Sequence, residues 1–205
     1  MATAFTEQER AEIERQLRAA ALRCAAQKGL RQTTVDELAR GAGVSKGAFY
    51  SFYPSKEHLF LAMLEELYEE IYGGAERILE ERGDLPIRQR TALAIAEVCR
   101  VMKQRDMMAF LQNDLPLLLR KLPPETISQH YQSGEAHMER LVRKAGVTLG
   151  GRMETVCAVI RLLVSSLINR DWVGEGYDEA LQILIDGACD RLVQEIHQRV
   201  TNLLD

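Results

Sequence analysis

Four consecutive residues, Ser45, Lys46, Gly47 and Ala48, have the side chains that a helix end needs if it is to enter the major groove of DNA. These side chains are small or cationic, and the groove is only about 12 Å wide. Lys46 can reach a guanine edge or a phosphate, and Ala48 can touch a thymine methyl group. Free backbone N–H groups at the start of a helix also favour phosphate. This run therefore predicts contact with duplex DNA.

Two more side chains near this run could bind phosphate. Tyr50 carries a hydroxyl that can bond a phosphate oxygen, and Lys56 places a second positive charge at the start of the next predicted helix. Contacts of this kind position a protein on DNA without reading its sequence. The affinity for DNA is therefore expected to come mostly from phosphate contacts, with few contacts to bases.

The charge is distributed unevenly along the chain. The 205 residues have a formal net charge of -4, yet the segment from Arg15 to Lys56 has eight basic and two acidic residues, a net +6, which leaves -10 for the rest. A basic segment attached to an acidic body is typical of a DNA-binding module joined to a separate domain.

The elements around the run form a predicted helix-turn-helix. A short helix begins at Thr33 or Thr34, because each has an acid three residues later that can complete a capping box. This helix ends near Gly43, which can take the left-handed conformation. A recognition helix then runs from about Ser45 to Tyr53 and would lie in the major groove. The alternative is an ordinary helical corner with no role in DNA binding, but the charge and the small side chains favour the helix-turn-helix.

The rest of the chain also has the helical period, which predicts an all-α fold. A capping box at Thr6 begins the first helix, and Gly29 ends it. Gly73-Gly74 could end or bend the helix that begins at Ser55. The later helices are expected at 87–104, at 106–122 with an interruption at Pro116, from Pro123 to about 145, and, after a linker at 146–151, at 152–171 and 177–203.

The sequence contains no motif of a helical enzyme. HExxH, paired ExxH, P-loop and GxGxxG patterns are all missing, so neither catalysis nor a cofactor is expected. His130 and His137 share a helix face but have no third ligand at a suitable spacing, so no metal site is expected either.

Cysteine spacing and the search for targeting segments predict the cellular compartment. The cysteines are scattered without CxxC spacing, which favours four reduced core thiols over disulfides. No apolar run approaches the ~20 residues that span a bilayer, and the first residues do not resemble a secretory signal. A cytoplasmic protein is expected.

The segment Thr33 to Phe60 reads TTVDELARGAGVSKGAFYSFYPSKEHLF. It resembles the DNA-binding domain of the TetR/AcrR family of bacterial repressors, which has a Thr-capped helix, Ala-x-x-Ala-Gly-Val-Ser, an aromatic–Tyr pair and a Ser–Lys pair. The resemblance covers about fifty N-terminal residues. It implies a three-helix DNA-binding domain at 6–60, with its helix-turn-helix at about 34–53, and a helical ligand-binding and dimerisation domain at 61–205.

The resemblance also assigns roles to single residues. It implies that Thr34, Tyr50 and Lys56 contact phosphates, and that the run from Ser45 to Ala48 faces bases or the adjoining backbone. Phe52 departs from the family, which commonly has His or Tyr there. Because Phe cannot donate a hydrogen bond, a polar DNA contact from this position is not expected.

The last two predicted helices have broad apolar faces. The resemblance implies that they pair with the same helices of a second copy in a four-helix bundle, and a dimer implies a palindromic operator with half-sites ~34 Å or a multiple apart. The alternative is that both faces are internal. The apolar positions are Cys157, Ile160, Val164, Leu167 and Ile168 in one helix, and Leu181, Leu184, Ile185, Ala188, Leu192, Ile196, Val200 and Leu203 in the other.

By the same resemblance, the helices between about 87 and 145 form a chamber for a small apolar or amphipathic effector, although a plain core is the alternative for any single residue. Filling the chamber would release a repressor from its operator. The competing hypothesis is an all-helical interaction protein, or a regulator with no small-molecule effector. The candidate chamber residues are Met102, Met107, Phe110, Asn113, Tyr131 and Met138.

Overall fold

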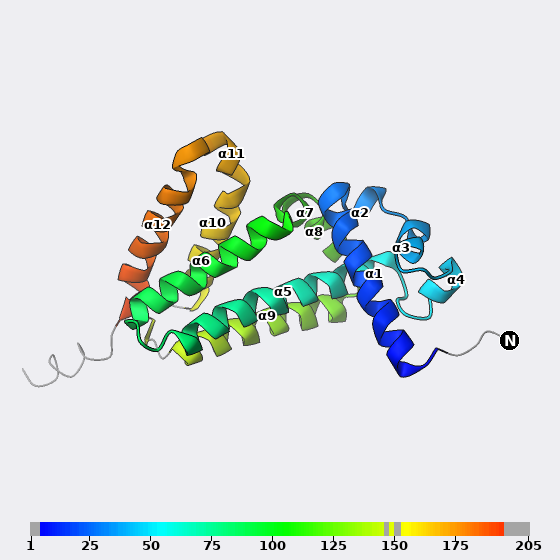
Figure 1. Ribbon diagram of the computed structural model, residues 1–205, viewed down its shortest axis with the longest axis horizontal. Coiled ribbons are helices and arrows are strands. Elements are labelled where there is room, and N and C mark those ends of the chain that lie inside the picture. The colour runs from blue at the N-terminus through cyan, green and yellow to red at the C-terminus, as the bar shows by residue number, and fades with distance from the viewer. Residues whose placement is uncertain (1–4, 146–147, 150–152, 195–205) are drawn as a thin grey trace, which may run out of the picture. The chain divides into compact units, whose positions relative to one another are not determined.

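The computed structural model describes residues 5–145, 148–149 and 153–194. Within them the predicted all-α fold is confirmed (Figure 1). The exception is one pair of two-residue strands, β1 (Thr148–Leu149) and β2 (Val193–Gln194), which are antiparallel. Most of the predicted linker at 146–151 and the predicted helical segment from 195 onward lie outside the described residues.

The chain divides into two compact units. The first comprises the residues up to Tyr68 together with Ala109–Gln129, and the second comprises Glu69–Met108 and the residues from His130 onward. The helices α5 (Lys56–Glu81) and α9 (Pro124–Ala145) contribute to both. In the first unit the segment 109–129 packs with the N-terminal helices. The division into functional domains at 6–60 and 61–205 stays a prediction.

The first unit contains one long helix at its start and several short ones of four to seven residues. Thr6 begins α1 with the predicted capping box, its side-chain oxygen accepting from the backbone N–H of Glu9 at 3.2 Å while the Glu9 side chain accepts from the N–H of Thr6 at 2.8 Å. Besides the N-terminal part of α5 and the start of α9, the unit contains α1 (Glu7–Gln27), α2 (Gly29–Gln32), α3 (Val35–Gly41), α4 (Lys46–Phe49), most of α7 (Met108–Asn113) and α8 (Leu115–Leu119).

One apolar core joins these helices. Phe60 on α5 stacks on Phe110 of α7, with ring centroids 5.7 Å apart and an interplanar angle of 17°. Burying a side chain of this size stabilises a fold by about 1.5–3 kcal/mol. The other large, fully buried side chains in the unit are Leu17, Leu30, Leu38, Phe49, Leu59, Leu64 and Leu118.

The second unit packs longer helices around two apolar clusters. Ile185 and Cys189 of α12 pack with Ile95 of α6 and Leu163 of α10 in the larger cluster. Ala75 and Leu79 of α5 pack with Ala94 of α6 in the smaller one. Besides α5 and α9, the helical elements of this unit are α6 (Ile87–Arg105), α10 (Met153–Ser165), η1 (Ser166–Asn169), α11 (Arg170–Val173), η2 (Gly174–Gly176) and α12 (Tyr177–Leu192).

Several predicted boundaries are wrong. The helix expected over 106–122 is two helices, and the break between them is at Asp114 rather than at Pro116, which falls within the first turn of α8. Gly73-Gly74 does not end α5, which continues to Glu81 because apolar burial at Ala75 and Leu79 outweighs the low helix propensity of glycine. The helix expected over 152–171 changes to 3-10 geometry after Ser165.

Candidate nucleic-acid interface

The turn between α3 and α4 is fixed by caps at both helix starts. Thr34, rather than Thr33, caps α3, and a capping box with Glu37 satisfies the backbone N–H groups of both residues, at 2.9 and 3.3 Å. Gly43 has φ +69°, as its place in the turn predicts. The hydroxyl of Ser45 then accepts from the N–H of Ala48 at 3.1 Å and begins α4.

Phe49 anchors α4 from its inner side. Its side chain is fully buried and its ring meets that of Tyr50 edge-on, with centroids 5.4 Å apart. Leu38 and Ala39 on α3 are buried as well, and α3 contacts α4. Because this face of α4 is buried, the opposite face presents Ser45 to Gly47 to solvent.

The recognition helix is shorter than predicted. It ends at Phe49 and is followed by turns rather than continuing to Tyr53. The hydroxyl of Ser51 donates to the carbonyl of Ala48 at 2.7 Å, and the N–H of Ser51 donates to the same oxygen at 3.0 Å. A serine that bonds the backbone in this way competes with helical hydrogen bonding, which ends the helix after about one turn.

Most of the predicted DNA-contact residues lie on the exposed surface of this motif. Thr34, Ser45, Lys46, Gly47 and Tyr50 are exposed; Ala48 and Lys56 are half-buried. The turn brings the first four of these to the helix starts at which they were expected. Their contact with DNA stays a prediction.

Lys46 already has a partner within the motif. Its ammonium donates to the carboxylate of Asp36 on α3 at 2.8 Å. The hydrogen bond and the charge of Asp36 raise the pKa of Lys46 above its ordinary value. The ammonium is therefore charged and held in the motif.

Lys56 has a structural role that the sequence did not reveal. Its ammonium donates to the backbone carbonyls of Leu30 and Thr33, at 2.9 and 2.7 Å, and so ties the start of α5 to the junction of α2 and α3. Burial lowers the pKa of Lys56. Two of the three ammonium hydrogens already form hydrogen bonds, so the third is left to bond a phosphate.

Arg10 is a cation of this surface that sequence reasoning missed. Its guanidinium lies over the ring of Phe52, 4.6 Å from the centroid, and donates to the carbonyl of Ser51 at 3.4 Å. Phe5 packs on the same ring at 5.7 Å. Phe52 thus supplies no polar contact of its own but holds a guanidinium beside the end of α4. No local pattern signals this contact, because 41 residues separate Arg10 from Ser51.

This geometry agrees with comparisons to known proteins. Residues 17–63 match the family model described as bacterial regulatory proteins, tetR family. The chain is similar to the HTH-type transcriptional regulator YuxN of Bacillus subtilis, with 46% identity over 68 residues, which are 32% of this chain and 22% of YuxN. Residues 17–63 are thus similar to the DNA-binding domain of TetR regulators.

The likeness to solved structures of transcription regulators extends to the fold of nearly the whole chain. A TetR family transcription regulator from Marinobacter aquaeolei VT8 has a TM-score of 0.66 with 18% identity, covering 93% of this chain and 100% of that one. FadR from Bacillus subtilis, solved in complex with stearoyl-CoA, has a TM-score of 0.61 with 19% identity, covering 89% and 99%. In sequence, the chain spans only about a fifth of the length of YuxN.

The residues predicted to line a TetR-type ligand chamber have mixed environments. Met102 and Met107 are buried in the second unit, and Phe110 is buried in the first. Asn113 and Tyr131 are exposed, and Met138 is half-buried. Their role in ligand binding stays a prediction.

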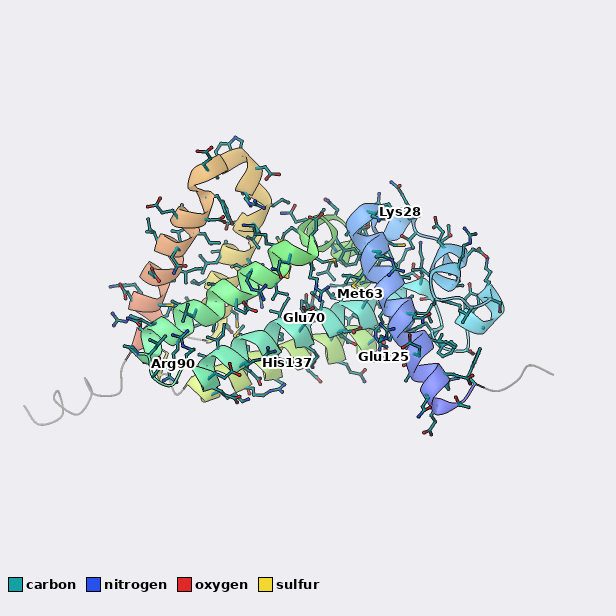
Figure 2. The ribbon with its side chains drawn as sticks, viewed as in Figure 1. Lys28, Met63, Glu70, Arg90, Glu125 and His137 are labelled. Carbon is teal, nitrogen blue, oxygen red and sulfur yellow. The ribbon has the colours of Figure 1, made fainter. Side chains whose placement is uncertain are left out.

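The two histidines examined as metal ligands are both buried on α9. Nε2 of His137 lies 2.8 Å from Glu69 Oε1, and its ring stacks on Tyr72 with centroids 4.8 Å apart. Figure 2 labels His137 on its helix. Among the described residues, no group of three His, Cys, Asp or Glu side chains could hold a metal ion.

The predicted dimer helices have both buried and exposed apolar residues. Leu167 and Ile185 are buried in the second unit, whereas Ile168 and Leu184 are exposed. Ile196, Val200 and Leu203 lie outside the described residues.

Over the part of the chain that is described, no helix is long and apolar enough to cross a membrane.

Proposed function

We propose that this chain is a TetR-family DNA-binding transcription regulator whose α4 enters the major groove. The observation that carries the proposal is the exposed face from Ser45 to Gly47, held outward by the fully buried ring of Phe49. Lys46 and Ala48 are the candidates for base contact, and Thr34 and Tyr50 are candidates for phosphate contact. Action on chromosomal DNA would place the protein in the cytoplasm.

The proposed regulator acts as a homodimer. The most exposed large apolar side chains between α10 and α12 are Leu162 at 71%, Trp172 at 89%, Ile183 at 65% and Leu184 at 57%. An exposed apolar surface of this kind on one helix layer supports a contact with a second copy. Two recognition helices related by a two-fold axis would then read a palindromic operator.

The proposed regulator is a repressor that a small apolar or amphipathic ligand releases from DNA. The likeness in fold to FadR, which was solved with stearoyl-CoA, supports a ligand of this class. The candidate chamber residues are those predicted from the sequence. For release, the ligand must bind the DNA-free conformation more tightly than the DNA-bound one.

Salt-dependent binding of the full-length protein to duplex DNA tests the function. We expect footprinting on genomic DNA to recover a palindromic site, and Lys46→Ala to weaken binding to that site by about 1–3 kcal/mol with some change in base preference. Fluorescence anisotropy on the recovered duplex measures both effects. The regulator proposal fails if wild-type protein shows no salt-dependent binding to any duplex.

A ligand screen on the protein–DNA complex separates the repressor model from its alternative. Stearoyl-CoA is the first probe, followed by other amphipathic compounds, and release of the labelled duplex is the readout. If the protein binds its operator but no compound releases it, a regulator without a small-molecule effector is the better description.

A further inference from the structure

Asp36 pairs with Lys46, the residue of α4 that is proposed to read a guanine. Its carboxylate lies 2.8 Å from the ammonium of Lys46, and the two side chains are 53% and 54% exposed. Asp36 is the second residue of α3, and Thr34, the cap of that helix, is a candidate phosphate contact. A negative charge therefore lies on the surface proposed to face DNA.

The local fold does not require this carboxylate. Thr34 and Glu37 already complete the capping box of α3, and Glu37 also accepts from Lys28. Exposed ion pairs such as that of Asp36 with Lys46 contribute little to folding. The two acids of the basic N-terminal segment thus differ, since one caps a helix and the other engages the recognition helix.

The Asp36 carboxylate distinguishes between the two DNA groups that Lys46 could meet. Guanine O6 and N7 are neutral acceptors, so Lys46 can donate to them with its remaining hydrogens and keep Asp36 as its counterion. A phosphate is an anion, and at Lys46 it would lie against a like charge. The ion pair therefore penalises phosphate contacts more than guanine contacts.

We propose that Asp36 is a specificity-determining residue, which lowers the affinity of the Lys46 surface for non-operator DNA. This inference rests on the proposed function as a DNA-binding regulator. It gives α3 a role in distinguishing operator from non-operator DNA, a role that the sequence motif assigns to α4 alone.

Replacing the charge at residue 36 tests the proposal. We expect Asp36→Asn to tighten binding of the full-length protein to a random-sequence duplex about three- to tenfold, and binding to the footprinted duplex of equal length by less. The plot of log affinity against log salt for the random duplex should steepen by about one unit per protomer. Asp36→Glu keeps the charge and should keep the wild-type ratio of the two affinities.

Asp84→Asn is the matched control, because Asp84 is an exposed aspartate paired with Arg82 at 3.5 Å in the other unit. It makes the same change in net charge and should leave both affinities within about twofold of wild type. If Asp84→Asn raised the affinity for the random-sequence duplex as much as Asp36→Asn does, the net charge of the protein rather than the position of Asp36 would explain the effect. That result would overturn the proposal.

The double variant Asp36→Asn/Lys46→Ala shows whether Asp36 acts through Lys46. If it does, adding Asp36→Asn to Lys46→Ala should raise the affinity for the random-sequence duplex by less than half as much as Asp36→Asn raises it in the wild-type protein. A full gain without Lys46 overturns the proposal, as does wild-type affinity of Asp36→Asn on both duplexes. Failure of every variant and of wild type to bind DNA would instead overturn the proposed function.

Discussion

Lys46 and Lys56 stand at similar positions in the sequence, each at the start of a helix after a serine, yet their surroundings differ. Lys46 is exposed and paired with the Asp36 carboxylate, whereas Lys56 is half-buried and bonded to two backbone carbonyls. Lys46 can bond a DNA base through its remaining ammonium hydrogens while Asp36 stays its counterion. Lys56 stabilises the junction from which Thr34 begins α3.

Replacing Lys56 with methionine separates these two kinds of lysine. Lys56→Met leaves the carbonyls of Leu30 and Thr33 without their donor, so we expect the free energy of unfolding to fall by about 1–3 kcal/mol. Urea denaturation measures this loss. A loss of DNA affinity with unchanged stability, and a salt slope shallower by about one unit, would instead support the phosphate contact predicted from the sequence.

Glu37 makes the stability of the first unit sensitive to acid. The hydrogen bond from Lys28, followed by those from the Thr34 backbone and side chain, lowers the pKa of Glu37 to about 2 from an ordinary value of 4.5. An acid with a lowered pKa in the folded state stabilises the fold above its unfolded pKa, and this contribution is lost as the pH falls through the folded value.

We therefore expect the melting temperature of the wild-type protein to fall between about pH 4.5 and pH 2 more steeply than that of Glu37→Gln. Glu37→Gln itself should be less stable at neutral pH, because the ion pair with Lys28 is lost. Parallel curves for the two proteins over this interval would show that Glu37 does not carry the acid sensitivity.

At the scale of elements, the junction of α1 and α2 depends on a glycine for two reasons. Gly29 has φ +76°, and a Cβ added to it would lie 2.3 Å from Oδ2 of Asp114, at the start of α8. Gly43 has a similar φ of +69° but open space around it. The two glycines therefore separate the cost of the backbone conformation from the cost of a steric clash.

We expect Gly43→Ala to destabilise the protein by about 1–2 kcal/mol, the cost of a left-handed alanine, and Gly29→Ala to cost more. Adding Asp114→Ala to Gly29→Ala should raise the stability to that of Gly43→Ala and no further. Chemical denaturation of the four proteins measures this. Equal costs for the two single variants would show that Asp114 does not crowd Gly29.

At the scale of the whole molecule, the exposed apolar side chains of α12 should determine the oligomeric state. Leu184→Glu places a charge in the proposed contact between copies, so we expect a dimer of the wild type to become a monomer with unchanged helical content. Operator affinity should fall with it, because one recognition helix per molecule remains. Analytical ultracentrifugation measures the first effect.

Leu93→Glu is the control for this change. Leu93 lies on α6, is 39% exposed and is not part of the apolar cluster that packs α6 against α12, so it offers an exposed leucine on another helix. It should leave the oligomeric state unchanged. A dimer that survives Leu184→Glu, or a monomeric wild type, would rule out the proposed contact.

The sequence by itself determined the parts of this protein that depend on neighbours within a few residues. Thr6 caps its helix, Gly43 turns the chain and Ser45 begins α4, because each of these interactions joins residues at most three positions apart or concerns a single backbone angle. The cap of α3 was narrowed to Thr33 or Thr34, and the structure selects Thr34. Periodicity likewise predicted an all-α chain, since it identifies the apolar face of each helix.

The tertiary structure alone decided which residues meet from distant parts of the chain. Lys56 bonds carbonyls 26 and 23 residues away, Arg10 reaches the carbonyl of Ser51, and 109–129 packs with the N-terminal helices. Periodicity shows that a face is apolar but not which helix covers it, because that choice depends on packing between whole elements. For the same reason the pairing of Asp36 with Lys46, ten residues apart across a turn, emerged only from the fold.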